Sequence, residues 1–229
     1  MVDSLCEALG SPNVLAAASR SPPDDVRELL QVARRRTFAR GEVVFHEDDP
    51  ADSMHLIDKG RFAVRTRTRL GDASLLAIHG QGATFGELAL LTGDAKRSAT
   101  VSALEAGETR SVFRNDFARL QKRHPGVNEI LLRLLADQLR RTNERLLEAH
   151  YVDADTRVRR RLLELGNLYG DGASPMTVPL TQEELAEMAG TSRATVNRVL
   201  RDEQQRGSVD LQRGKTTILD QPALAKRAR

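Results

Sequence analysis

Cysteine is almost absent from this chain of 229 residues, which contains only Cys6. A single cysteine cannot form an intrachain disulfide. It also cannot supply the ligands of a cysteine-held iron–sulfur cluster or of a zinc site of the usual four-ligand kind. The sequence therefore excludes redox sensing through such a cluster.

Long apolar runs are absent as well. Hydrophobic residues make up 40% of the chain, but no uninterrupted apolar run approaches the length that spans a membrane. The first residues, MVDSLCEALG, lack the basic start and the long apolar core of a secretory signal. We therefore expect a cytoplasmic protein without a membrane partner.

The length and the distribution of charge suggest two domains. A chain of 229 residues can form two domains that each bury a core. The formal net charge is only +3, but residues 156–229 contain 13 Lys and Arg against 9 Asp and Glu. All of the excess positive charge thus lies in the C-terminal part, as binding to nucleic acid would favour.

The N-terminal half changes its pattern near residue 37. Residues 1–36 end in apolar positions at helical spacing, so we predict a tail followed by a short helix. In residues 37–124, short apolar runs alternate with turn residues such as Asp48-Asp49-Pro50 and Lys59-Gly60. Many short strands separated by turns predict a β-roll or a barrel-like sandwich.

Residues 125–152 predict a long amphipathic helix. Apolar residues recur at intervals of three and four from Val127 to Leu139 and resume at Leu146, with the polar stretch Arg140-Arg141-Thr142-Asn143 between them. Such a helix can pack on its own domain or pair with its twin across a dimer axis. We favour dimerisation, because proteins that read palindromic DNA need a two-fold partner.

Residues 153–229 have the pattern of a winged helix-turn-helix. Thr181 followed by Gln182-Glu183-Glu184 is a capping arrangement for a first helix, Gly190 supplies a turn, and Ser192 or its neighbour Thr191 can cap a second helix. The hairpin wing is expected from residues 208–211 and 216–219, with Arg213-Gly214-Lys215 at its tip. The whole chain is therefore expected to have an α+β fold.

A second motif lies in the predicted β-roll, in the run FGELALLTGDAKRSATV. Taken alone, Glu87 is typical of a helix cap and Arg97-Ser98 of a surface. Together with Gly86, they suggest a pocket for a small phosphorylated sugar: a carboxylate can accept from ribose hydroxyls, and a guanidinium and a hydroxyl can bind phosphate.

From Thr37 to Leu219 the chain resembles the CRP/FNR family of bacterial transcription regulators. The resemblance rests on three stretches in the expected order: ARGEVVFHEDDPADSMHLIDKG, FGELALL with KRSATV, and EELAEMAGTSRATVNRVL. It implies a cyclic-nucleotide-binding β-roll, a dimerisation helix and a winged helix-turn-helix, controlled by cyclic AMP. RNA polymerase is then an expected partner, beside palindromic double-stranded DNA.

The resemblance also implies which residues bind the ligand. Gly86, Glu87, Leu88 and Ala89 would approach the ribose and phosphate, while Arg97 and Ser98 would bind the phosphate. The adenine would contact two polar residues of the long helix, Thr142 and Asn143, the second of them from the partner subunit.

The DNA contacts are expected on the helix-turn-helix and the wing. Arg193 and Arg198 suit guanine O6 and N7 in the major groove. Other residues of the second helix are expected to face outward, and further polar residues are expected to contact phosphates and so to position the module. The outward residues are Thr195 and Asn197, and the phosphate contacts are Thr181, Gln182, Ser192 and Lys215.

Two positions depart from the family pattern. Gln138 stands one turn before Thr142, where well-known cyclic-AMP-responsive members carry a basic residue. Ala194 stands where members commonly place Glu, which accepts from the N4 amine of cytosine. We therefore predict that guanine preference is retained and that selection at the cytosine position is relaxed.

Three alternatives remain open at this point. The same fold could respond to a cyclic dinucleotide or to no ligand, as the departure at Gln138 allows. The nucleotide module could be the regulatory subunit of an enzyme, although a single module followed by a DNA reader argues against it. Glu87 and Arg97 could turn over a nucleotide, but neither a metal cluster nor an activated nucleophile accompanies them. No histidine spacing singles out a haem ligand, and we expect a protein that is not an enzyme.

Overall fold

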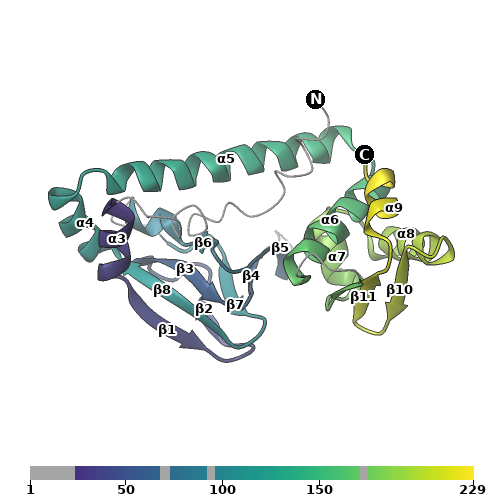
Figure 1. The fold of residues 1–229 in the computed structure, drawn as a ribbon, viewed down its shortest axis with the longest axis horizontal. Coiled ribbons are helices and arrows are strands. Elements are labelled where there is room, and N and C mark those ends of the chain that lie inside the picture. Colours follow the sequence, from purple (N-terminus) through teal and green to yellow (C-terminus); the bar gives the residue numbers. More distant parts are fainter. Residues whose placement is uncertain (1–23, 68–72, 92–95, 171–174) are drawn as a thin grey trace. The chain divides into compact units, whose positions relative to one another are not determined.

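The computed structural model describes residues 24–67, 73–91, 96–170 and 175–229 (Figure 1). The chain divides into two compact units at Arg140 and Arg141. We call the described residues up to Arg140 the N-terminal unit and those from Arg141 onward the C-terminal unit, and we describe each unit by itself. The predicted tail, up to residue 23, lies outside the described residues.

The N-terminal unit is built on two four-stranded antiparallel sheets, in the orders β1-β8-β3-β6 and β2-β7-β4-β5. The strands are β1 (Arg34–Phe38), β2 (Val43–Phe45), β3 (Ser53–Lys59), β4 (Phe62–Arg67), β5 (Ala73–His79), β6 (Thr84–Phe85), β7 (Thr100–Ala103) and β8 (Gly107–Phe113). One apolar cluster takes Phe38 and Ile57 from the first sheet and Phe62 and Val101 from the second. The two sheets therefore pack face to face, and the predicted β-roll of short strands is confirmed.

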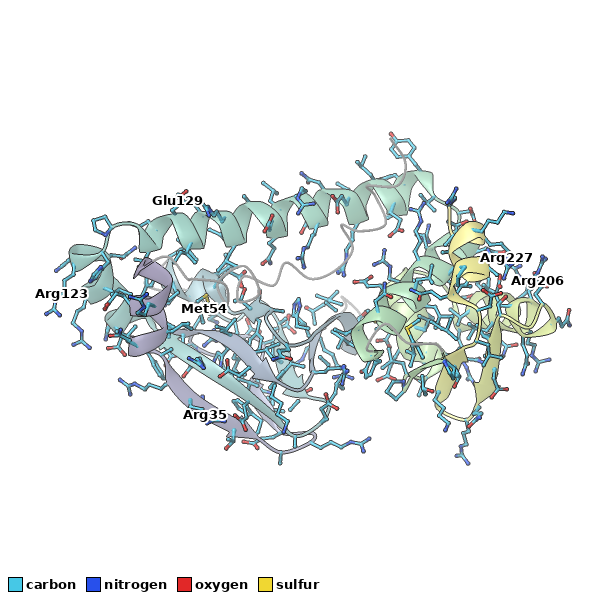
Figure 2. All side chains as sticks on the ribbon, viewed as in Figure 1. Arg35, Met54, Arg123, Glu129, Arg206 and Arg227 are labelled. Carbon is cyan, nitrogen blue, oxygen red and sulfur yellow. The ribbon has the colours of Figure 1, made fainter. Side chains whose placement is uncertain are left out.

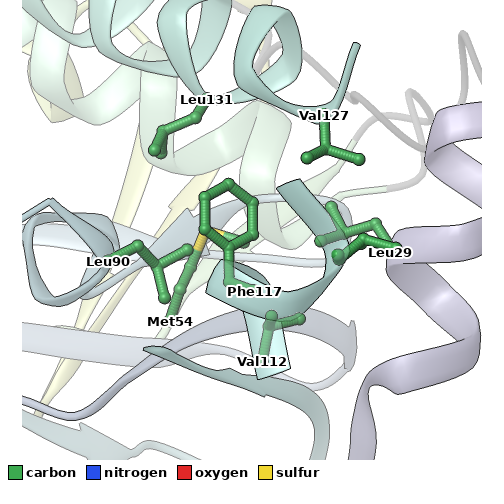
Figure 3. Packing of buried hydrophobic residues seen from close by; sticks show 8 residues of the cluster. Leu29, Met54, Leu90, Val112, Phe117, Val127 and Leu131 are labelled. Atoms are coloured by element: carbon green, nitrogen blue, oxygen red, sulfur yellow. The ribbon is translucent and has the colours of Figure 1, made fainter. Parts of the chain in front are cut away.

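Helices close one end of this β-roll. They are α3 (Asp24–Val32), α4 (Arg114–Arg123) and the first part of α5 (Val127–Tyr151). Figure 3 shows Leu29 from α3 and Val127 and Leu131 from α5 directed toward Phe117 of α4, which is 2% exposed. Burial of each such side chain contributes about 1.5–3 kcal/mol, so this cluster fixes the start of α5 on the sheets.

The side chains of the N-terminal unit separate by polarity. Met54 of β3 is buried beneath α5, whereas Arg35 and Arg123 lie at the surface (Figure 2). Glu129, on the solvent side of α5, pairs with Arg133 one turn later. Within the described part of the chain, no helix combines the length and the apolar character that crossing a membrane requires.

Helix α5 buries only its first turns. Val127 and Leu131 are buried, but Leu132, Leu139 and Leu146 are 65%, 62% and 56% exposed. These three leucines follow one another at intervals of seven residues, which places them along one side of the helix. The single chain therefore presents an unburied apolar stripe along α5.

The C-terminal unit combines the end of α5 and four further helices with a three-stranded sheet in the order β10-β11-β9. The elements are α6 (Ala154–Tyr169), β9 (Met176–Val178), α7 (Gln182–Ala189), α8 (Arg193–Gln205), β10 (Val209–Gln212), β11 (Lys215–Ile218) and α9 (Gln221–Arg227). The core includes Val158 and Leu162 of α6, Leu200 of α8 and Leu224 of α9, all at most 1% exposed. The predicted winged helix-turn-helix is confirmed.

The final helix, α9, was not predicted. It begins after Asp220, whose side chain accepts a hydrogen bond from Ala223 N at 2.9 Å, and it carries a proline in its first turn. Both features are ordinary helix start signals. They follow the wing directly, and the sequence motifs of the winged helix-turn-helix end before them.

Candidate nucleotide-binding and DNA-binding sites

The first candidate site begins at Gly86, between β6 and the short 3₁₀ helix η1 (Glu87–Leu90). Gly86 has a φ of 77°, in the left-handed region that favours glycine. A Cβ added here would lie 2.7 Å from Arg97 Nη1 and 3.0 Å from Ser53 O. The absence of a side chain therefore lets the Arg97 guanidinium lie against this turn.

Glu87 directs a buried carboxylate into the same region. Glu87 is only 5% exposed, and this burial raises the pKa of its carboxyl group. A hydrogen bond with the side chain of Gln138 and the positive charge of Arg97 oppose that rise. Because residue 138 is glutamine and not a basic residue, the group of α5 that contacts the carboxylate is a neutral amide.

Arg97 is also buried, at 5% exposure. Its Nη1 donates to Ser53 O at 2.6 Å, and its Nη2 donates to Ser53 Oγ at 3.0 Å and to Asp52 Oδ1 at 3.2 Å. The guanidinium carbon lies 4.0 Å from the centroid of the Phe45 ring, within the range of a cation–π contact.

One donor of this guanidinium is left over. Arg97 Nε is buried and has no hydrogen-bond partner among the described residues. Burial lowers the pKa of the Arg97 guanidinium, and the nearby charges of Asp52 and Asp49 act in the opposite direction. A buried cation with an unmade N–H bond beside a glycine turn fits an anionic group such as a phosphate.

Sequence reasoning missed the residues that hold Arg97. Ser53 and Asp52 lie more than 40 positions earlier in the chain, and no motif pairs them with Arg97.

The Ser53 hydroxyl also contacts His55. This residue is 1% exposed, and its ring stacks on Phe85 with the ring centroids 5.0 Å apart and an interplanar angle of 7°.

His55 is bonded on both sides of its ring. Its Nδ1 lies 3.1 Å from Thr109 Oγ1 and its Nε2 lies 3.5 Å from Ser53 Oγ. Burial, with a smaller contribution from the charge of Arg97, lowers the pKa of His55 to about 3. The ring is therefore neutral, and it completes a buried polar chain that runs from Arg97 through Ser53 to Thr109.

The structure brings together only some of the predicted ligand residues. Gly86, Leu88 and Ser98 lie in the N-terminal unit with the buried residues Glu87, Ala89 and Arg97, although Leu88 is 45% exposed and Ser98, which follows Arg97, is also exposed. The other two predicted residues, Thr142 and Asn143, are exposed on α5 and belong to the C-terminal unit.

The second candidate site is the helix-turn-helix formed by α7 and α8. Thr181 and Glu184 form a capping box at the start of α7, and Gly190 ends that helix with a φ of 59°. Ser192 caps α8 by accepting from Thr195 N at 3.1 Å. These local signals fix Arg193 as the first residue of α8.

The outward residues of α8 differ in their partners. Arg193 is exposed, and no other residue that the structure describes forms an ion pair with it. Arg198 forms an ion pair with Asp155 of α6. Asn197 donates to Gln182 Oε1 at 2.9 Å, which links the two helices of the motif. Lys215 is exposed at the start of β11, and Ala194 is exposed beside Arg193.

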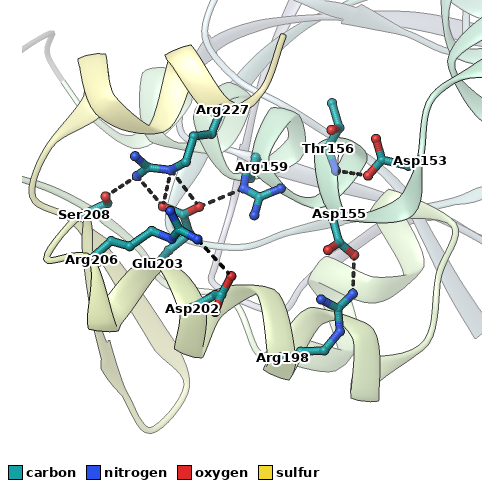
Figure 4. A network of polar contacts seen from close by, with 10 residues as sticks. All are labelled: Asp153, Asp155, Thr156, Arg159, Arg198, Asp202, Glu203, Arg206, Ser208 and Arg227. Carbon is teal, nitrogen blue, oxygen red and sulfur yellow. Dashed lines mark hydrogen bonds and ion pairs between the residues drawn. The ribbon is translucent and has the colours of Figure 1, made fainter.

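A buried charge fixes the far end of α8. Glu203 is fully buried and accepts from Arg159 Nε of α6 at 2.7 Å and from Arg227 Nε of α9 at 3.0 Å (Figure 4). Burial alone would raise the pKa of the Glu203 carboxyl, but the hydrogen bonds from Arg227 and Arg159 bring its pKa below the ordinary value. The carboxylate therefore ties α6 and α9 to α8.

Comparisons with known proteins match both parts of the chain. The sequence matches a cyclic nucleotide-binding domain over residues 35–124 and a Crp-like helix-turn-helix domain over residues 156–227. It is 35% identical to a CRP-like cAMP-activated global transcriptional regulator of Mycobacterium tuberculosis, over 90% of this chain and 93% of the relative.

Solved structures show the same architecture. The catabolite activator protein of Thermus thermophilus is 32% identical, with a TM-score of 0.51, over 91% of this chain and 95% of that chain. The c-di-GMP responsive regulator CLP of Xanthomonas campestris has a TM-score of 0.71 at 20% identity, over 86% of this chain and 98% of that chain. The second likeness concerns the fold alone.

These matches define a class of protein: DNA-binding transcription regulators with a cyclic nucleotide-binding domain, which are not enzymes. The chain belongs to the CRP/FNR family, as its three sequence motifs predict.

Proposed function

We propose that this chain is a homodimeric transcription regulator whose DNA binding is controlled by cyclic AMP. The observation that carries the proposal is the pair of buried charges at Glu87 and Arg97, with Arg97 Nε lacking a hydrogen-bond partner among the described residues. A phosphate oxygen can accept a charge-assisted hydrogen bond from such a donor. The name of the Mycobacterium tuberculosis relative, a cAMP-activated regulator, supports the same ligand.

Each ligand residue has a separate role in this proposal. Glu87 accepts from a ribose hydroxyl. Its carboxylate is buried and bonds to the neutral amide of Gln138, and two carboxylate oxygens can accept further hydrogen bonds. Arg97 and Ser98 bind the phosphate, with the backbone from Gly86 through Leu88 to Ala89 beside them. Adenine contacts come from Thr142 and, in the partner subunit, from Asn143.

Dimerisation is proposed along α5. The stripe of Leu132, Leu139 and Leu146 is exposed in the single chain, and its seven-residue interval is the period at which paired helices meet. A second copy would cover the stripe and provide the two-fold symmetry of a palindromic site. We accordingly propose residues 37–124 for ligand binding, 125–152 for dimerisation and 153–229 for DNA, after a leading segment, residues 1–36.

DNA reading is proposed for the exposed face of α8. Arg193 and Arg198 contact guanines, with Thr195 and Asn197 on the same helix beside them. Phosphate contacts position the module without reading sequence, and they come from Thr181, Gln182, Ser192 and Lys215.

The ligand is proposed to act by population shift, because it binds the DNA-competent dimer more tightly than the other form of the dimer. The protein is proposed to act in the cytoplasm, with RNA polymerase as its partner at the promoter.

Calorimetric titration of the full chain tests the ligand. We expect micromolar or tighter binding of cyclic AMP, and weaker or no binding of cyclic GMP and cyclic di-GMP. Arg97→Gln should weaken the binding of cyclic AMP by about 100-fold. Arg110→Gln should leave it unchanged, because Arg110 pairs with Asp58 on the same β-roll and is only half-buried. Heat with cyclic di-GMP alone would assign the pocket to a cyclic dinucleotide, and no heat with any nucleotide would remove the ligand from the proposal.

A further inference from the structure

The two arginines on the exposed face of α8 stand in different surroundings. Arg193 is exposed and, among the residues of the described ranges, has no ion-pair partner. Arg198 donates from Nη2 to Asp155 Oδ1 (Figure 4). The two side chains of this pair are 61% and 30% exposed, so the pair lies at the surface.

Asp155 is held in a fixed position relative to α8. It lies in the first turn of α6, which begins after the capping residue Asp153, whose carboxylate accepts from Thr156 N at 2.9 Å. Arg157 of the same turn donates to Ala189 O at 2.9 Å and to Gly190 O at 3.0 Å. These bonds tie the start of α6 to the turn of the helix-turn-helix, so the carboxylate meets Arg198 from a rigid neighbour.

This pair changes what Arg198 can bind. A guanidinium has five N–H donors, and Asp155 occupies one of them, so four stay available for a base edge. The carboxylate also offsets the positive charge of Arg198, and it repels phosphates that approach the same place. A guanine edge offers two acceptors in a fixed geometry, whereas a phosphate binds any nearby positive charge.

We propose that Asp155 is a specificity-determining residue, which orients Arg198 for a base and weakens its binding to phosphates of unrelated sequence. The hydrogen bond with Asp155, followed by its charge, raises the pKa of the Arg198 guanidinium. The inference rests on the proposed reading role of Arg198. Asp155 is a positioning residue in this respect, since it acts on DNA through another side chain.

The test compares binding of the full chain to a selected cognate duplex and to a random duplex over a range of salt concentrations. We expect Asp155→Asn to bind random DNA more tightly and to lower the ratio of cognate to random affinity. The slope of log K against log salt on random DNA should become steeper by about 0.9 for each subunit bound, which corresponds to about eightfold between 1 M and 0.1 M salt. Asp155→Glu keeps the charge and should keep the wild-type slope.

Two controls separate this role from a general change in charge. Asp202→Asn removes the same charge from the exposed surface of α8, where Asp202 pairs with Arg206, and it should change the ratio less than Asp155→Asn. In an Arg198→Ala background, Asp155→Asn should have no further effect on random DNA. Asp155→Ser provides a second neutral variant if the asparagine variant does not fold.

The outcomes distinguish the inference from the proposed function. If Arg198→Ala leaves the ratio of affinities unchanged, the reading role of Arg198 fails and the inference fails with it. If Arg198→Ala lowers the ratio but the neutral variants of Asp155 change neither ratio nor slope, only the inference is overturned. The same result follows if Asp155→Asn acts equally with and without Arg198.

Discussion

Both units of this protein bury charged groups, but they treat them differently. In the N-terminal unit, Arg97 retains a buried N–H without a partner among the described residues, and burial raises the pKa of Glu87. In the C-terminal unit, Glu203 is fully buried, receives hydrogen bonds from two arginines and has a lowered pKa.

Under the proposed function, this difference separates a ligand-binding site in the N-terminal unit from a structural joint in the C-terminal unit. A buried charge whose hydrogen bonds are all made stabilises one arrangement, and loss of its partner is costly. A buried charge with an unmade bond costs free energy in the folded state, and a ligand that supplies the partner recovers it. Substitutions in the two units should therefore act on different quantities: stability in one, ligand affinity in the other.

The largest effect on stability is expected at the structural joint. Glu203→Ala removes the carboxylate that pairs with Arg159. Because the Arg159 side chain is only 12% exposed, water replaces this partner poorly, and the free energy of unfolding should fall by about 3 kcal/mol. Urea unfolding of the full chain, followed by circular dichroism, measures this. Asp202→Ala, on the exposed side of the same helix, should change it by about 0.5 kcal/mol at most. Equal losses for both variants would show that Glu203 is not a structural joint.

Removal of the unsatisfied charge should affect ligand binding instead. Arg97→Gln should weaken cyclic AMP binding by about 100-fold, because a charge-assisted contact in a buried site is lost. It should change the free energy of unfolding less than Glu203→Ala does. Calorimetry and urea unfolding of the same preparations give both numbers. A variant that unfolds easily and still binds cyclic AMP would reverse the assignment of the two sites.

The buried imidazole predicts a dependence of stability on pH. The pKa of His55 is about 3 in the folded chain and near its ordinary value of about 6.5 in the unfolded chain. Between these values the unfolded state binds one more proton, so stability is lost as the pH falls from about 6.5 toward 3, at up to about 1.4 kcal/mol per pH unit.

The variant His55→Gln isolates this contribution, since other groups titrate in the same range. Its free energy of unfolding should depend less on pH than that of the wild type between pH 6 and pH 4. Parallel curves for the two proteins would show that the imidazole is not buried as a neutral ring.

A smaller effect is expected at the residue that orients Arg97. Ser53→Ala removes the hydroxyl that accepts from Arg97 Nη2, which is worth about 1 kcal/mol, so cyclic AMP binding should weaken about fivefold. Ser102→Ala is the matched control, because Ser102 accepts from Arg65 on another strand of the same unit. Identical titrations for Ser53→Ala and wild type would mean that the guanidinium is positioned by the other contacts alone.

Local signals explain why much of the fold could be predicted from the sequence. The capping box at Thr181, the turn at Gly190 and the cap at Ser192 each depend on residues three or four positions apart, and all three occur as expected. The short strands were predicted for the same reason, because turn residues punctuate them. The sequence has comparable start signals for α9, but they lie beyond the last motif of the winged helix-turn-helix, so no helix was predicted there.

The partners of the site residues could not be predicted, because they come from distant parts of the chain. Arg97 is held by Ser53 across 44 positions, and Arg198 is paired with Asp155 across 43. Only the folded sheets and helices bring these groups together. The spacing of Glu87 and Arg97 predicted a pocket, but it contained no information on the bonds that leave Arg97 Nε available.

Gly86 has a consequence for the inheritance of this regulator. Any other residue there would have to adopt a φ of 77°, and its Cβ would meet the Arg97 guanidinium at 2.7 Å. Under the proposed function, a change in one codon would therefore displace the phosphate-binding Arg97 without altering any residue of α8. Such a variant would keep its contacts with DNA and lose its response to the nucleotide.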